Sequence, residues 1–221
     1  MKRLEKILAL LLVMVMCVAL FTGCESKKER LAAKQAELCD GKWLNITADS
    51  EEQAVVLLEN IDLYEGEIAV VDTTNLKYAR IMEYSMTGMY RQYISVEHTK
   101  VCVRDFYEET FASLYENRAA IDDLYDAALT DMTEEEFQLF YAGLYSYDDF
   151  DALLDYFTEI AYKYDWEDLE VGTYSLDDED TLSILREAEG VDSEGTVDFK
   201  VENGTLTLYY NNSTAVYSKI G

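Results

Sequence analysis

Carboxylates are the side chains in this sequence with the most obvious capacity for chemistry. The chain has 45 acidic residues against 18 basic ones, and residues 105–170 hold 20 acids against Arg118 and Lys163. A retaining glycosidase needs two carboxyl groups about 5 Å apart, so a carboxylate-based hydrolase is one function to consider. Because the acids are so numerous, no pair stands out, and we interpret most of them as solvated helix faces.

Two smaller groups of residues have the types that bind metals or activate a nucleophile. Residues 177–180 read Asp-Asp-Glu-Asp, but they lack the alternating spacing with which calcium loops surround an ion, and we interpret them as a turn. His98 and Cys102 are four residues apart, which is the spacing of one helix face. His98 is the single histidine of the chain, so no second histidine completes a zinc site or a triad. We therefore predict no metal site, no cofactor and no catalytic residue.

The first 24 residues have the pattern of an export signal. A positively charged start is followed by an apolar run from Ile7 to Phe21, which is too short to span a bilayer and is typical of a secretory signal. The run ends in Leu20-Phe21-Thr22-Gly23-Cys24, which resembles a bacterial lipobox, with Phe21 where Leu is commoner. The resemblance implies cleavage after residue 23 and a diacylglyceryl group on the thiol of Cys24. We therefore expect a lipid-anchored protein on the extracytoplasmic side of the cell membrane.

The chain is expected to have three parts: a signal peptide (1–23), a tether (24–39) and a folded body (40–221). The tether is polar and rich in basic residues, and one interpretation is that these lie against anionic headgroups. We favour the other, a solvated spacer, with a helix near its end as an open option. With Cys17 removed and Cys24 lipidated, Cys39 and Cys102 remain. We expect free thiols, although an exported compartment permits a disulfide between them.

The body that must position these residues begins with a short strand and a helix. Residues 41–46, Gly-Lys-Trp-Leu-Asn-Ile, are predicted to form the strand. Ser50-Glu51-Glu52-Gln53 matches a capping box, and apolar side chains then recur at helical spacing from Ala54 to Val71. Gly66 interrupts this face, so residues 66–72 are either the end of the helix or a strand.

A hairpin and a helical block follow. Residues 77–85 and 89–95 are rich in Tyr, Ile and Met and flank a short turn that contains Gly88, which predicts the hairpin. Apolar residues then recur at helical spacing over residues 97–164, where we predict three or four helices. Thr133 is expected to cap one of these helices, and Ser146, with Asp149 three residues later, another.

The C-terminal third is predicted to consist of strands. Two short strands within residues 172–185 flank the acidic turn, and apolar and polar residues alternate along residues 196–220. Such alternation buries one face of each strand and leaves the other in water. Asn203-Gly204 is the strongest hairpin signal in the sequence, and Asn211-Asn212 marks a further turn.

Together these elements predict an α+β fold of about eight antiparallel strands with a helical insertion at about 97–164. The Gly41-Lys42-Trp43 motif and the meander of residues 195–220 resemble the lipocalin-like (calycin) barrels. The resemblance implies a closed barrel with Trp43 at its closed end and Lys219 packed on it, where the family prefers Arg. The sequence has no Thr-Asp-Tyr motif, and its helical insertion departs from the family. The whole chain also resembles lipoproteins of gut Firmicutes, a class without an assigned activity.

Composition narrows the function further. A net charge of −27 excludes nucleic acid as a partner, because nothing would neutralise its phosphates. We expect a non-catalytic module that holds a small or apolar molecule in or on the barrel mouth, with a dry cavity lined by Val197, Phe199, Leu206 and Leu208. The alternatives are a surface protein that binds a partner through the acidic helices of 97–164, and the hydrolase considered above.

Overall fold

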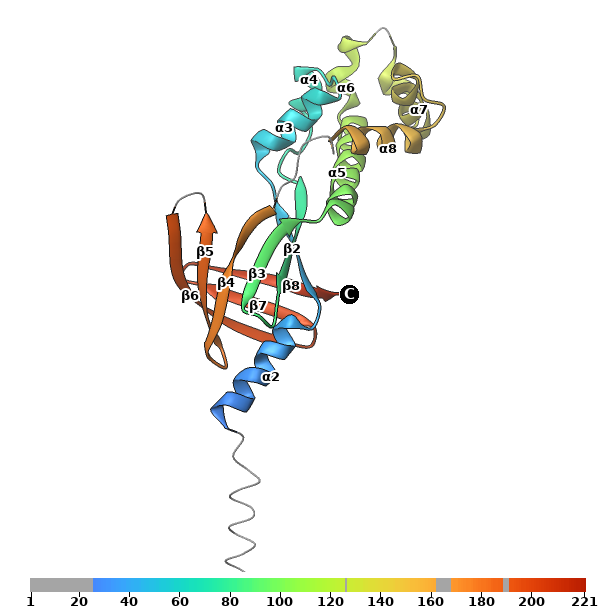
Figure 1. Cartoon of the computed structure of the whole chain (residues 1–221). Helices are drawn as coiled ribbons and strands as arrows, with labels where there is room; N and C mark the ends of the chain where they lie inside the picture. The colour runs from blue at the N-terminus through green and yellow to red at the C-terminus, as the bar shows by residue number, and fades with distance from the viewer. Residues whose placement is uncertain (1–25, 126, 162–167, 189–190) are drawn as a thin grey trace, which may run out of the picture.

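Eight antiparallel strands form a closed barrel that carries helices at both ends. The computed structural model describes residues 26–125, 127–161, 168–188 and 191–221. Within these residues each strand pairs with the next one in sequence, and β8 pairs with β1. A helical lobe stands at one end of the barrel and helix α2 at the other (Figure 1). The expected α+β barrel is confirmed, and it is compatible with a lipocalin-like architecture.

The strands of the C-terminal third extend further than their sequence pattern predicted. Opposed residues of paired strands share a face, so the pairing register shows which side chains point inward. Strand β1 pairs with β8 over Lys42–Leu44, close to the α2 end of the barrel. The strands are β1 (Lys42–Ala48), β2 (Lys77–Tyr84), β3 (Met89–Ile94), β4 (Asp168–Asp178), β5 (Thr181–Ala188), β6 (Val191–Glu202), β7 (Thr205–Tyr210) and β8 (Ser213–Ile220).

The turn between β6 and β7 confirms the strongest hairpin signal of the sequence. Asn203 and Gly204 both have positive φ, 52° and 74°. A two-residue turn with this backbone matches the twist of the strands that it joins, and Asn-Gly is the pair that adopts it at least cost.

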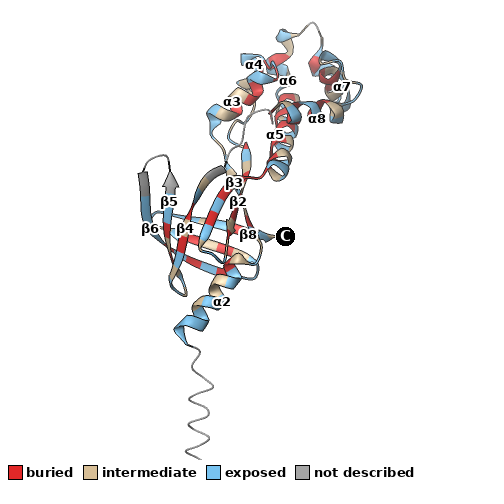
Figure 2. Cartoon of the chain, in the orientation of Figure 1, coloured by how far each residue is buried: buried red, intermediate tan, exposed pale blue. Residues whose placement is uncertain are grey.

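Two insertions, and not one, build the helical lobe. The first, between β1 and β2, holds α3 (Glu51–Asn60) and α4 (Glu65–Ile68). The second, between β3 and β4, holds α5 (Val96–Glu116), α6 (Arg118–Ile121), two 3₁₀ turns, α7 (Glu134–Leu144) and α8 (Phe150–Ala161). Side chains from both insertions pack in one apolar core, which is distinct from the core of the barrel. Figure 2 shows buried residues both in the lobe and in the barrel. The open choice at 66–72 resolves in favour of the short helix α4.

Polar side chains cap most of these helices as predicted. Ser50 Oγ accepts a hydrogen bond from the Gln53 amide, and Thr133 and Glu136 form a reciprocal capping box. The prediction for α8 was wrong in one detail. Asp149 Oδ1 accepts from the Ala152 amide at 2.7 Å, so Asp149 is the capping residue, while Ser146 has φ 66° in the preceding turn.

Helix α5 joins the lobe to the barrel by packing on the outer face of β2. Thr99 is fully buried there, and its Oγ1 accepts a hydrogen bond from the Ala79 amide at 3.0 Å. Ala79 and Ile81, which point away from the barrel interior, are buried beneath the helix. The lobe is therefore seated on the barrel wall.

Helix α2 (Lys27–Cys39) replaces most of the expected spacer. Ser26 and Glu29 form a capping box at its start, and the Leu38 side chain at its end is completely buried in the barrel core. The solvated-spacer interpretation is therefore corrected over residues 27–39, because this segment is a helix whose end is held against the barrel core. No helix within the described ranges is long and apolar enough to cross a bilayer.

Candidate ligand site beneath helix α2

The half of the barrel nearest α2 is filled by side chains. The four residues expected to line a dry cavity, Val197, Phe199, Leu206 and Leu208, are each 6% exposed or less and pack in one apolar cluster. Aromatic rings occupy the space between them, and Tyr84 and Tyr174 meet edge to face at 5.0 Å. These four side chains therefore form a packed core, and a ligand site must lie elsewhere on the barrel.

Trp43 is buried at the end of the barrel nearest α2. Its indole Nε1 donates to the Leu38 carbonyl at 2.8 Å, which fixes the end of α2 to the barrel. Lys219 lies opposite Trp43 in the β1–β8 register, and its ammonium group pairs with Asp40 at 2.7 Å. Gly41 has φ 113°, and a Cβ there would lie 2.9 Å from the Lys219 side chain. Glycine is therefore required where the chain turns from α2 into β1.

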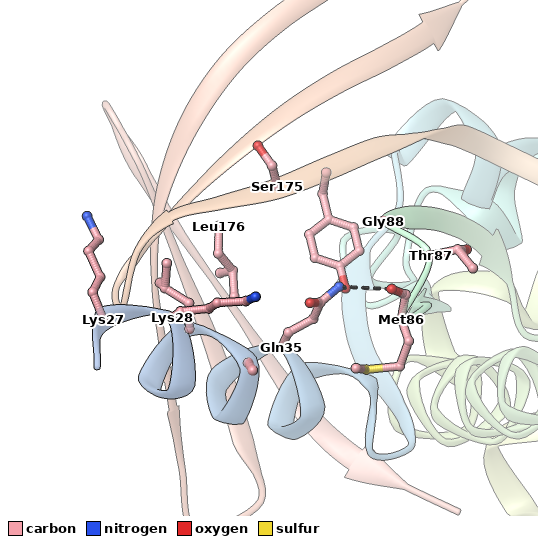
Figure 3. A pocket seen from close by; sticks show the side chains of 11 residues that line it. Lys27, Lys28, Gln35, Met86, Thr87, Gly88, Ser175 and Leu176 are labelled. Carbon is pink, nitrogen blue, oxygen red and sulfur yellow. Dashed lines mark hydrogen bonds between the residues drawn. The ribbon is translucent and has the colours of Figure 1, made fainter. Parts of the chain in front are cut away.

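A groove of about 680 Å³ lies between the first half of α2 and the barrel (Figure 3). Its volume is within the range of small-molecule sites. Helix α2, the β2–β3 turn and the end of β4 contribute its lining residues: Lys27, Lys28, Leu31, Ala32, Gln35, Met86, Thr87, Gly88, Tyr174, Ser175 and Leu176.

Polar groups at the inner end of this groove are already satisfied. Gln35 Nε2 donates to the Met86 carbonyl at 3.2 Å, as drawn in Figure 3, and the Tyr174 hydroxyl donates to the Ser85 carbonyl at 2.9 Å. The Cys39 thiol lies 3.2 Å from the Tyr174 hydroxyl. Apolar side chains, including Leu31 and Leu176, supply much of the remaining surface, so the groove suits an apolar group.

Charge is distributed unevenly around the groove. Its lining includes the ammonium groups of Lys27 and Lys28 and no carboxylate, although the whole chain carries −27. Lys27 and Arg30 reach the β4–β5 turn, where they pair with Asp178 at 3.7 Å and Glu179 at 2.6 Å. Both pairs are exposed and contribute little stability each. They nevertheless hold the start of α2 across the open side of the groove.

The structure does not join His98 and Cys102 into a dyad. His98 Nδ1 lies 2.8 Å from Ser95 Oγ at the start of α5, and Cys102 is 9% exposed. Burial raises the pKa of the Cys102 thiol, which disfavours the nucleophilic thiolate. Cys39 and Cys102 are free thiols, as expected.

A few basic side chains form ion pairs that join the acidic helices. Arg104 on α5 pairs with Asp151 at 2.8 Å and also with Asp155, both on α8. Several large apolar side chains of the lobe are nevertheless exposed, among them Leu139, Leu144 and Tyr156. These residues are the surface on which the partner-binding alternative depends.

Two carboxyl groups that are held by several side chains, Glu67 and Glu83, lack the features expected of a glycosidase acid in an open cleft. Glu67 is fully buried, and both the Tyr125 and Tyr141 hydroxyls donate to its Oε1, so no substrate can reach it. Burial alone would raise the pKa of Glu83, but hydrogen bonds from Lys42, Tyr93 and Arg91 hold it at about 2. The 177–180 run forms the β4–β5 turn, and no cluster of three or more potential ligands that could hold a metal is found among the described residues.

The groove itself escaped sequence reasoning, because α2 was interpreted as a spacer. The signal was present, since Ser26-Glu29 has capping-box spacing and Leu31, Gln35 and Leu38 follow at helical spacing. Cys24, the predicted lipid site, lies outside the described residues. Comparison with protein-family models, curated proteins and solved structures finds no match for the chain.

Proposed function

We propose that this chain is a lipid-anchored, extracytoplasmic binding protein without catalytic activity, whose groove beneath α2 takes a small apolar or amphipathic molecule. The observation that carries the proposal is the groove of about 680 Å³, with its apolar lining and two lysines and no carboxylate. Apolar walls supply the binding free energy, and a few polar groups set the orientation. The lysines favour a molecule with a polar or anionic end.

The position of the groove fits this anchor. Lys27, the first residue of α2, comes three residues after Cys24. Three residues span at most about 10 Å, so a lipid on Cys24 would hold the α2 end of the barrel near the bilayer surface. Amphipathic molecules concentrate at that surface, where the groove would meet them.

The anchor is tested by metabolic labelling of cells with an alkyne-bearing fatty acid. The wild-type protein is expected to incorporate the label and to fractionate with membranes, and Cys24→Ser to lose both properties. Cys17→Ser, a change of the same kind within the predicted signal, should leave labelling intact. Labelling of the Cys24→Ser protein would refute the anchor.

The groove is tested by extracting and identifying the small molecules that co-purify with the full-length protein from its own membranes. Ala32 lines the groove, so Ala32→Trp should fill it and reduce the co-purified molecule by about tenfold or more. Ala33 is exposed on the same helix and does not line the groove, so Ala33→Trp is the matched control. Equal recovery from both variants would rule out the groove as the site.

A further inference from the structure

The inner face of the barrel changes character halfway along its axis. The half nearest α2 is apolar, whereas the half nearest the helical lobe, which we call the upper half, is polar. The pairing registers place Arg80 opposite Asn45, Gln92 opposite Glu170, and Arg186 opposite Gly172, all on the face that Met82, Tyr90 and Ile184 share with the buried core. A barrel that served only as a scaffold would have no need of charged groups on this face.

Two guanidinium groups and one carboxylate lie on this polar face. Glu170 is already shared, because Arg186 pairs with it at 3.3 Å and the Tyr90 hydroxyl donates to it. Arg80 is different. Its Nε is buried and has no hydrogen-bond partner among the described residues, no ion pair is found for it there, and its guanidinium lies 4.7 Å from the Tyr78 ring centroid. A partly exposed guanidinium whose buried Nε has neither a hydrogen-bond partner nor a counterion among the described residues is costly, so its retention points to an anion.

The same three charges also act on two tyrosines that belong to other strands of the barrel. Burial raises the pKa of Tyr210 on β7, and raises that of Tyr217 on β8 to about 12. The charges of Arg186, Arg80 and Glu170 act on both hydroxyls, with each guanidinium lowering the pKa and the carboxylate raising it. Side chains from β2, β4, β5, β7 and β8 therefore surround one polar volume.

Gly195 leaves the β6 side of this volume open. It lies opposite Ile184 in the β5–β6 register, so its missing side chain would point inward, and a Cβ placed there meets nothing within 4 Å. Gly195 is also exposed to solvent. Below it the apolar core is filled, and Val197 and Leu208 are buried. Because the core below is filled, the space beside Gly195 suits a compact group better than a long chain.

We propose that the upper half of the barrel binds the carboxylate or phosphate group of a compact small molecule, with Arg80 as its principal ligand and Arg186 as the second. The planar guanidinium of Arg80 can donate two parallel hydrogen bonds to such an anion. This site is separate from the groove beneath α2, and it does not depend on the proposed function of that groove.

Binding is measured by isothermal titration calorimetry of the full-length protein reconstituted in nanodiscs. Inorganic phosphate and hexyl phosphate distinguish a free anion from an anionic head on a short tail. Hexanoate and dodecanoate test chain length, and hexanol and hexylammonium test charge. We expect the anions to bind, dodecanoate no more tightly than hexanoate, and hexanol and hexylammonium not at all.

Variants locate the site. Arg80→Gln should weaken anion binding at least tenfold, since it removes the charge-assisted hydrogen bonds that the guanidinium donates. Gly195→Val, which keeps both arginines but fills the open space, should weaken it as well. Arg91→Gln removes the same charge from the outer face of the neighbouring strand β3 and should leave binding unchanged.

A second measurement guards against misfolded variants. Because the anion compensates a buried charge, hexanoate should raise the melting temperature of the wild type and not that of Arg80→Gln. Without anion, Arg80→Gln should melt no lower than the wild type. The proposal is overturned if hexanol binds as well as hexanoate, or if Arg80→Gln and Arg91→Gln bind the anion equally. Neither result would bear on the groove, which Ala32→Trp tests independently.

Discussion

Individual carboxylates in this acidic protein have quite different environments. Glu67 is enclosed in the helical lobe, where tyrosine hydroxyls and the Tyr64 amide satisfy its oxygens and tie α4 to the neighbouring helices. Glu83 lies on the outer barrel wall, where Lys42 and Arg91 flank it. Each is held by specific partners, so their roles were invisible in a sequence where acids occur throughout.

Glu83 gives the molecule a defined response to acid. Its pKa is about 2 in the folded protein against about 4.5 for an unperturbed glutamate. The lower folded-state pKa means that its ionised form stabilises the fold above about pH 4.5, and that this contribution is lost as the pH falls from 4.5 towards 2. Glu83→Gln should therefore lower the melting temperature by roughly 2 °C at neutral pH and by almost nothing near pH 2.

Melting curves recorded by circular dichroism between pH 2 and pH 7 check this prediction. Glu109→Gln, the same change at an exposed position on α5, is the matched control for the loss of one carboxylate from this acidic protein. A constant offset between wild type and Glu83→Gln across the whole range would contradict it.

At the scale of elements, the sequence pattern predicted the helices and hairpins whose formation depends on residues close together in the chain. Helix α5 and the β6–β7 hairpin follow from periodicity and turn chemistry. The features that the pattern missed depend on contacts between residues far apart in the sequence. Helix α2 has one fully buried residue, Leu38, so its short apolar face could not reveal the barrel beneath it. The two insertions share one core although β2 and β3 separate them in sequence, and the inward arginines become visible only when strand register is known.

Helix α2 depends on its last turn for docking. Leu38→Ala should destabilise the protein by about 2–4 kcal/mol, because it opens a cavity in the barrel core beside Trp43. It should also increase hydrogen exchange throughout α2, since the contacts that remain are single hydrogen bonds, such as that from Gln35 Nε2 to the Met86 carbonyl, and exposed ion pairs at the start of the helix. Hydrogen-exchange mass spectrometry with chemical denaturation measures both effects. Leu139→Ala, at a leucine that is 48% exposed, should do neither. Unchanged exchange in α2 of the Leu38→Ala protein would refute this account of docking.

At the scale of the whole molecule, repulsion between carboxylates outweighs the attraction between opposite charges. Acids outnumber bases by 27, and exposed ion pairs such as those of Arg104 neutralise a minority of them. Salt weakens both the attraction within ion pairs and the repulsion between carboxylates. The repulsion is the larger of the two, because acidic residues far outnumber basic ones. Raising NaCl from 10 mM to 500 mM should therefore raise the melting temperature by several degrees, as followed by differential scanning fluorimetry. Sucrose at matched osmolality is the control for non-ionic effects, and a melting temperature that falls with salt would contradict the prediction.

The pairing of β1 with β8 makes closure of the barrel a long-range event. Strand β2 is the near neighbour of β1, but β8, its second partner, lies some 170 residues further along the chain. Until β8 is in place, the sheet keeps two unpaired edges, which invite aggregation and proteolysis. A polypeptide that stops before Ser213 therefore stays an open sheet and is exposed to both fates.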